Sequence, residues 1–222
     1  MRKYLKQEIN TYKMKNKTLI LPFLFIGLLS NCQNKNTVVK NNVNNVEKKS
    51  TNDCKAIFRK FNEKLVVEEN DSALYYLDKA IECDPKNNSF KYSKVKFLTN
   101  IKKYEDAIKQ LDELTSNSTD PSLKMQKGIL KLKINAVDSK NVLEKCYAEF
   151  NLIEKPTSSN SLYKIALDNY FKGKEYSLNE IKKFRQEYMG KPYETDNINA
   201  LEELIKKESK ENVLFKLFDI ND

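Results

Sequence analysis

The side chains with most chemical potential in this 222-residue chain are its four cysteines, Cys32, Cys54, Cys83 and Cys146. No two of them form a CxxC pair, the spacing typical of structural zinc sites and thiol oxidoreductases. The chain has no histidine, so it lacks the commonest general base and any Ser-His or Cys-His nucleophile pair. Its four glycines are too scattered for a phosphate-binding loop. We therefore expect no catalytic residues, no metal and no cofactor.

The net charge of +9 is concentrated near the N-terminus. Residues 1–31 hold six Lys or Arg and one Glu, and residues 32–52 hold four Lys and one Glu, which leaves 30 basic against 29 acidic residues beyond them. Only three of the 40 basic residues are arginine, whose planar fork suits base and phosphate recognition. Nucleic acid is therefore not expected as a partner.

The N-terminal segment indicates an export signal. Lysines precede an apolar run from Leu19 to Leu29, and small or polar residues follow it, which is the layout of a signal peptide. An eleven-residue run is about half of what a membrane-spanning helix needs. Met14 begins a conventional signal, so translation starts at either Met1 or Met14.

The end of this segment resembles the lipobox of bacterial lipoproteins. In Leu29-Ser30-Asn31-Cys32, Leu stands three residues before the cysteine that would receive diacylglycerol, and Asn31 departs from the usual Gly, Ala or Ser. The resemblance implies a signal peptide over 1–31, lipidation of Cys32, and a protein anchored to the outer or inner membrane of the bacterial cell envelope. In this family, acidic residues soon after the lipidated cysteine signal display on the cell surface, and residues 33–36 hold none, so the resemblance implies the periplasm-facing side.

Residues 32–52 predict a tether. They are rich in Asn and Lys and hold few apolar side chains, so they cannot bury enough apolar surface to fold. We expect the lipidated Cys32 and a disordered linker over 32–52, with a reach of roughly 25 Å for twenty flexible residues. A folded domain is then predicted over 53–222.

The domain repeats with a period of about 35 residues. Pro85, Pro121, Pro156 and Pro192 lie 36, 35 and 36 residues apart, each after an amphipathic stretch. Proline lacks the amide donor and clashes with the preceding turn, so it ends a helix. One set of apolar helix-face positions recurs in the same order in the next unit: Ala73, Leu74, Leu77 and Ala80 match Ala107, Ile108, Leu111 and Leu114. The period predicts an array of helical hairpins.

Two segments resemble the tetratricopeptide repeat (TPR). Residues 73–88, with small residues at Ala73 and Ala80 and an Asp-Pro turn, resemble the second helix of the repeat, and residues 103–107 resemble the turn between its two helices. The match covers 54–120 well and weakens afterwards. It implies an all-α fold of stacked antiparallel helical hairpins, a TPR-like right-handed superhelix of about four units, with capping helices from about residue 196.

In this family the first helix of each unit lines a concave surface that binds partners. With units beginning at Cys54 and Asn88, the resemblance implies that a common partner-binding surface includes Asn62, Tyr92, Lys96, Asn100 and, from the fourth unit, Tyr163. Tyrosine combines contact area with a hydrogen-bonding tip, so this lining suits an extended peptide or loop. The alternative for each residue is packing between units or plain solvation.

Cys54 and Cys83 occupy the start of the first helix and the end of the second in one hairpin, two places that lie side by side. A disulfide there would persist outside the cytoplasm and close a loop of about 30 residues. Two reduced cysteines packed as small apolar side chains fit the sequence equally well. Cys146 lies on an apolar helix face and is expected to be a buried free thiol.

Together these patterns predict a lipid-anchored, noncatalytic protein–protein interaction platform whose partners are envelope proteins or peptides. Two alternatives stay open. An envelope enzyme using Asp, Glu, Lys and Tyr calls for a cleft with a strongly perturbed carboxylate or lysine, and a small-ligand carrier calls for an enclosed apolar cavity. The pairs Glu68-Glu69 and Glu202-Glu203 are interpreted as solvated helix faces.

Overall fold

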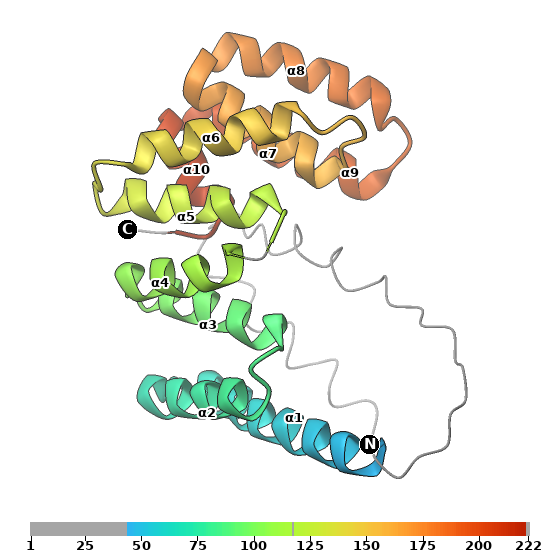
Figure 1. Ribbon diagram of the computed structural model, residues 1–222. Helices are drawn as coiled ribbons and strands as arrows, with labels where there is room; N and C mark the ends of the chain where they lie inside the picture. The colour runs from blue at the N-terminus through green and yellow to red at the C-terminus, as the bar shows by residue number, and fades with distance from the viewer. Residues whose placement is uncertain (1–43, 117, 221–222) are drawn as a thin grey trace. The chain divides into compact units, whose positions relative to one another are not determined.

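The computed structural model describes residues 44–116 and 118–220, and this part of the chain is all-helical (Figure 1). The predicted signal peptide, the Met14 start, Cys32 and the tether up to residue 43 lie outside the described residues. No helix within the described ranges has the length and apolar character needed to cross a bilayer. The all-α fold class predicted from the sequence is confirmed.

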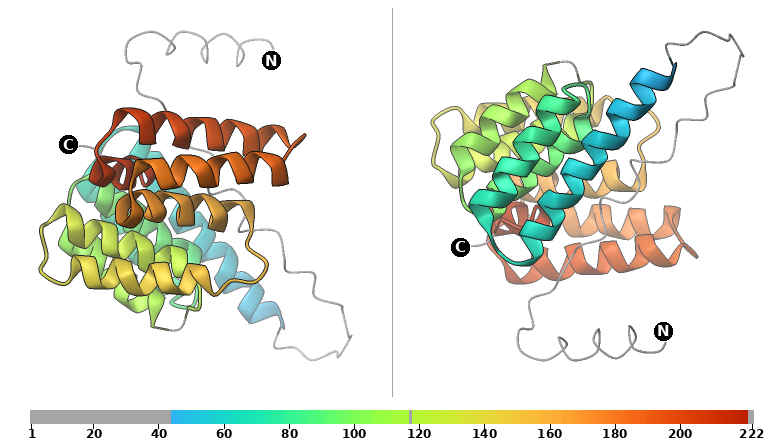
Figure 2. Two further views of the ribbon diagram at one scale, coloured as in Figure 1. Left: turned by 90° about the horizontal axis from the view of Figure 1, so that it is seen from above. Right: turned by 90° about the horizontal axis from the view of Figure 1, so that it is seen from below.

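The helices are α1 (Asn44–Val66), α2 (Asn70–Cys83), α3 (Asn88–Asn100), α4 (Tyr104–Thr115), α5 (Pro121–Lys133), α6 (Ser139–Asn151), α7 (Ser158–Lys172), α8 (Lys174–Glu187), α9 (Pro192–Lys207) and α10 (Lys210–Leu217). The first eight pair as hairpins α1/α2, α3/α4, α5/α6 and α7/α8. Each hairpin packs on the next through α2–α3, α4–α5 and α6–α7 (Figure 2). The chain therefore folds into four hairpins stacked in sequence order.

Two boundaries differ from the sequence prediction. Helix α1 begins at Asn44, so residues 44–52 belong to a helix and not to the tether. Prolines 121 and 192 open the helices that follow them, at the first helical position, where a missing amide hydrogen costs nothing. All four prolines of the period therefore lie where one hairpin ends and the next element begins, as expected, but two of them start the following helix.

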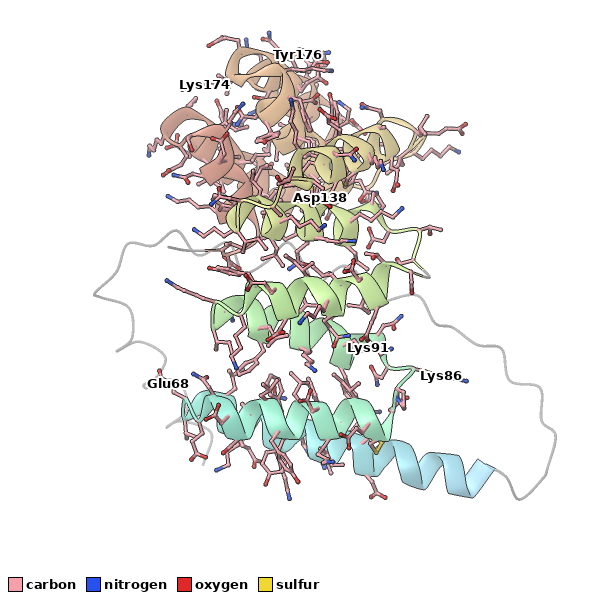
Figure 3. The ribbon with its side chains drawn as sticks, turned by 60° about the vertical axis from the view of Figure 1, so that its left-hand side comes forward. Glu68, Lys86, Lys91, Asp138, Lys174 and Tyr176 are labelled. Carbon is pink, nitrogen blue, oxygen red and sulfur yellow. A yellow bond between two sulfur atoms is a disulfide. The ribbon has the colours of Figure 1, made fainter. Side chains whose placement is uncertain are left out.

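The turn inside each of the first three hairpins has one geometry. The second residue after the first helix is left-handed, with φ of 58° at Glu68, 61° at Lys102 and 56° at Asn135. The next amide then donates to the carbonyl five residues back, over 3.0, 2.8 and 2.9 Å: Glu69 to Lys64, Lys103 to Leu98, Ala136 to Lys131. This bond satisfies the end of the first helix. In Figure 3 Glu68, in such a turn, and Lys86, between two hairpins, lie at opposite ends of the first hairpin.

The interfaces between hairpins also repeat. Lys94 on α3 pairs with Asp78 on α2 at 2.7 Å, and Lys127 on α5 pairs with Asp112 on α4. At the third interface the pattern changes, because Tyr147 on α6 donates instead to Asp168 on α7. Seven of the eight apolar positions of the period are buried as predicted: Ala73, Leu77 and Ala80 in α2, and Ala107, Ile108, Leu111 and Leu114 in α4. The eighth, Leu74, is partly buried.

Cys54 and Cys83 are joined by a disulfide, with 5.5 Å between their Cα atoms, within the range for this bond (Figure 3). It ties the start of the repeating part of α1 to the end of α2. Cys146 is a buried free thiol. Its S–H donates to the Pro121 carbonyl at 3.1 Å, and burial raises the pKa of the thiol.

The final two helices close the stack in different ways. Helix α9 packs on α8 and α7, as expected of a capping helix. Helix α10 instead turns back onto α7, α9 and α5. Both helices therefore contact the last hairpin, and α10 also reaches α5 of the third hairpin, because its apolar face packs on the first helices of two hairpins.

Substituting Gly128 tests the close approach of α5 and α6. A Cβ at this position would lie 2.7 Å from Leu143 Cδ2 and 2.9 Å from its Cγ, and Leu143 is fully buried and cannot move aside. We expect Gly128→Ala to lower the free energy of unfolding by about 1 kcal/mol, because overpacking exceeds the gain in helix propensity. Thermal and urea denaturation measure this effect. Lys145→Ala, on the exposed side of α6, is the control, and an equally or more stable Gly128→Ala protein would contradict this packing.

Reduction tests the disulfide. Opening a loop of 29 residues should cost about 2–4 kcal/mol. We expect a reductant to lower the melting temperature of the wild type and to leave a Cys54→Ala/Cys83→Ala variant unchanged at its already lower value. Calorimetry with and without dithiothreitol provides the measurement. A wild type insensitive to reductant would show that the bond does not contribute to stability.

Candidate partner-binding surface

The first helices α1, α3, α5 and α7 carry the residues that the sequence analysis places on a partner-binding surface. We call this the first-helix surface. Asn62, Lys96 and Leu130 occupy equivalent positions on it in units one, two and three. The first two are exposed, whereas Leu130 is fully buried. One position of the repeat therefore meets solvent in units one and two and is covered in unit three.

The chain's own C-terminal segment, defined here as residues 210–220, lies on α5 and α7. Phe218 stacks on Tyr163 of α7 with 5.6 Å between ring centroids. The ammonium groups of Lys133 and Lys210 lie 4.9 Å and 5.0 Å from the rings of Phe215 and Tyr170. Five apolar residues of the segment are buried: Val213, Leu214, Leu217, Phe218 and Ile220. The segment thus covers the first-helix surface in units three and four.

Tyr163 is consequently not available to a partner in this structure. It is 3% exposed, and burial raises the pKa of its hydroxyl, with smaller contributions from Tyr92 and the Asp120 carboxylate. The prediction that Tyr163 lies on the open binding surface is corrected, because the aromatic ring packs against Phe218. Tyr92 is half-buried, and burial likewise raises the pKa of its hydroxyl.

The open part of the first-helix surface lies on α1 and α3. Its exposed side chains, which include three of the predicted residues, are Lys55, Asn62, Lys96 and Asn100. Phe58, between them in sequence, instead stacks on Phe90 at 4.7 Å and joins the two helices. Helix α3 holds three lysines and no acidic residue. The open part therefore presents cations and amides.

The end of the C-terminal segment borders this open part. Asp219 is exposed as a residue, but surrounding protein desolvates its carboxyl and raises the pKa, and the positive charge of Lys96 opposes that rise. The charge of Lys96 therefore acts on Asp219 from a neighbouring unit. This places the boundary between covered and open surface at α3.

A second polar cluster surrounds Asp168 on α7, whose side chain is fully buried. Its carboxylate accepts from Tyr147 and from Lys164 at 2.8 Å, and Lys172 lies 3.4 Å away. Hydrogen bonds with Tyr147 and Tyr176 raise the pKa of Lys172, so this lysine stays protonated and is a poor base. The cluster satisfies a buried carboxylate at the third hairpin interface, in place of the ion pair found at the first two.

A pocket of about 300 Å³ opens beside this cluster. Its lining includes the apolar side chains of Phe150, Ile165 and Phe184 and the charged side chains of Lys164, Glu180 and Lys183. The two lysines are already paired, Lys164 with Asp168 and Lys183 with Glu180 at 2.6 Å. The described residues hold no group of three or more His, Cys, Asp or Glu side chains that could bind a metal.

In comparisons with known proteins, no family model, no curated protein and no solved structure matches this chain. The return of the C-terminal segment was missed in the sequence analysis. The sequence feature that could have predicted this return is the change from Asn62 and Lys96 to Leu130 at equivalent positions. An apolar residue at a position that is otherwise polar and exposed implies that another segment covers it.

Proposed function

We propose that this protein is a lipid-anchored, noncatalytic platform of the bacterial cell envelope that binds protein segments on the open part of its first-helix surface. The observation that carries the proposal is the exposure of Lys55, Asn62, Lys96 and Asn100 on neighbouring hairpins that the C-terminal segment leaves uncovered. Stacked hairpins hold such side chains on a rigid frame, so binding needs little reorganisation.

The chemistry of this surface favours an extended segment with carboxylates. Amide side chains both donate to and accept from a peptide backbone, and lysines attract negative charge. Because exposed charges are screened by salt, the affinity should fall as ionic strength rises. Asp219, at the border of the open part, already brings one carboxylate within reach of the charge of Lys96.

Two features support an envelope location. The disulfide between Cys54 and Cys83 suits an oxidising compartment outside the cytoplasm. The lipobox-like segment ending at Cys32 provides the anchor, because two or more acyl chains make membrane release slow. An anchored platform searches for partners along the membrane surface, which raises their effective concentration.

Charge reversal on the open part tests partner binding. We expect Lys55→Glu/Lys96→Glu to reduce by at least tenfold the proteins recovered after crosslinking in cells and affinity purification, because it repels acidic segments. Lys109→Glu/Lys145→Glu places the same charge change on exposed positions of α4 and α6 and should leave recovery unchanged. Quantitative mass spectrometry compares the variants. Equal recovery from both variants, or no protein above a mock purification, would refute the proposal.

Cys32→Ala tests the anchor. Labelling with a radioactive fatty acid should mark the wild type and not the variant, because the thiol is the acceptor of the diacylglycerol. The variant should also move from the membrane fraction to the soluble fraction. Cys146→Ala, which leaves the lipobox-like segment intact, is the control and should be labelled normally. Equal labelling of wild type and Cys32→Ala would remove the lipid anchor from the proposal.

A further inference from the structure

Two polar groups are desolvated, one on α5 and one in the C-terminal segment. Gln126 on α5 is 3% exposed, and among the described residues its Oε1 has no hydrogen-bond donor. This residue is the unit-three equivalent of Tyr92 in unit two. At the other end, the carboxyl of Asp219 is partly desolvated. A buried acceptor without a donor and a desolvated carboxyl each carry a free-energy cost in the folded chain.

The segment is also held in a way that permits exchange. Helix α10 has eight residues, fewer than an isolated helix needs to be stable in water, so its helical state depends on the surface beneath it. Only Glu208 and Ser209 connect it to α9. Its ring and lysine contacts join Phe218 to Tyr163, Lys210 to Tyr170 and Phe215 to Lys133. A tethered segment occupies its site at high effective concentration and needs little intrinsic affinity to stay there.

We propose that the covered part of the first-helix surface, on α5 and α7, is a binding site for short amphipathic helices, and that residues 210–220 are its resident occupant, which a partner helix displaces. This inference rests on the proposed function and adds the class of partner. The contacts of the resident define that class. It is a helix with apolar residues at i, i+1, i+4 and i+5, as at Val213, Leu214, Leu217 and Phe218, and with an aromatic residue at the last of these positions for Tyr163.

The position of the resident suggests how exchange begins. Asp219, at the end of the segment, borders Lys96 on the open part. An acidic partner segment bound there competes with Asp219 for the charge of Lys96. A helix that follows this acidic segment in the partner then meets the exposed end of the resident first. The open and covered parts would thus act as adjoining sites for one partner.

A labelled peptide of residues 208–220 is the probe. Fluorescence anisotropy of the peptide with the detergent-extracted full chain measures binding, and hydrogen exchange measures the protection of the α10 amides in the chain. We expect saturable binding that speeds exchange selectively in α10. A chain carrying Phe218→Ala should bind the peptide at least tenfold more tightly than the wild type, because its resident has lost the stack on Tyr163. A peptide carrying Leu214→Asp/Phe218→Ala is the control and should not bind.

Two changes separate a displaceable occupant from a permanent part of the fold. A peptide carrying Phe218→Ala alone should bind several-fold more weakly than the parent peptide, because it lacks the stack on Tyr163. Lys133→Ala in the chain removes a contact with Phe215 that the resident and the peptide share, so it should weaken both alike and leave the apparent affinity of the peptide nearly unchanged. The proposal is overturned if the folded Phe218→Ala chain does not bind the peptide, or if exchange accelerates throughout the molecule instead of in α10.

These outcomes are independent of the capture experiment with Lys55→Glu/Lys96→Glu. Partner recovery that depends on the open part, together with no peptide binding, removes only the helix site. If the peptide binds but no partner is recovered, the platform function is refuted. The site is then only an internal contact of the protein, and the claim that a partner displaces the segment is overturned.

Discussion

The structure depends on the packing of each hairpin against the next. A two-helix hairpin cannot bury both of its faces, so its stability comes from its neighbours. Here the second helix of one hairpin meets the first helix of the following one, with Ala73 and Ala80 allowing close approach and the Asp78–Lys94 pair beside them. The arrangement recurs one period later at Ala107 and the Asp112–Lys127 pair. This packing holds the helices in a fixed order. It thereby also fixes the positions of the side chains on the first-helix surface.

A stack of this kind has two ends, and this chain closes them differently. At the start, residues of α1 such as Arg59 and Lys60 are exposed and charged and tolerate contact with solvent, and the disulfide holds the first hairpin together. At the finish, α9 covers α8, and α10 turns onto the first helices α5 and α7. Closing the stack in this way also covers half of the surface that could bind a partner. The C-terminal segment therefore links the stability of the stack to the area of first-helix surface that a partner can reach.

The third hairpin interface shows how a departure from the repeat is accommodated. Cys146 stands at the position of α6 that is equivalent to Asp112 of α4, so the acidic partner of the ion pair is missing there. The buried carboxylate comes instead from Asp168 on the other side of the interface, and Tyr147, Lys164 and Lys172 surround it. A buried charge is tolerated only when it is paired and hydrogen-bonded, and this one is. The raised pKa of Lys172 agrees with a role in pairing.

Local signals in the sequence were sufficient for the helices, their order and their pairing. The recurrence of Ala73, Leu77 and Ala80 one period later, at Ala107, Leu111 and Leu114, identifies the buried face of α2 and α4, because apolar periodicity reports directly on burial. The expected free and buried state of Cys146 follows from the same periodicity. The start of α1 at Asn44 was missed, because an Asn- and Lys-rich composition carries little helical signal.

Only the tertiary structure decided which part of the first-helix surface stays open. The apolar face of α10 was visible in the sequence, but any exposed apolar face of the stack could have received it. The choice of α5 and α7 depends on contacts between residues far apart in the chain, such as Tyr163 with Phe218 and Lys133 with Phe215. Periodicity describes how one helix divides into faces and says nothing about which distant surface a face meets. Sequence alone thus determined the repeating units, and long-range packing determined the surface that they leave for a partner.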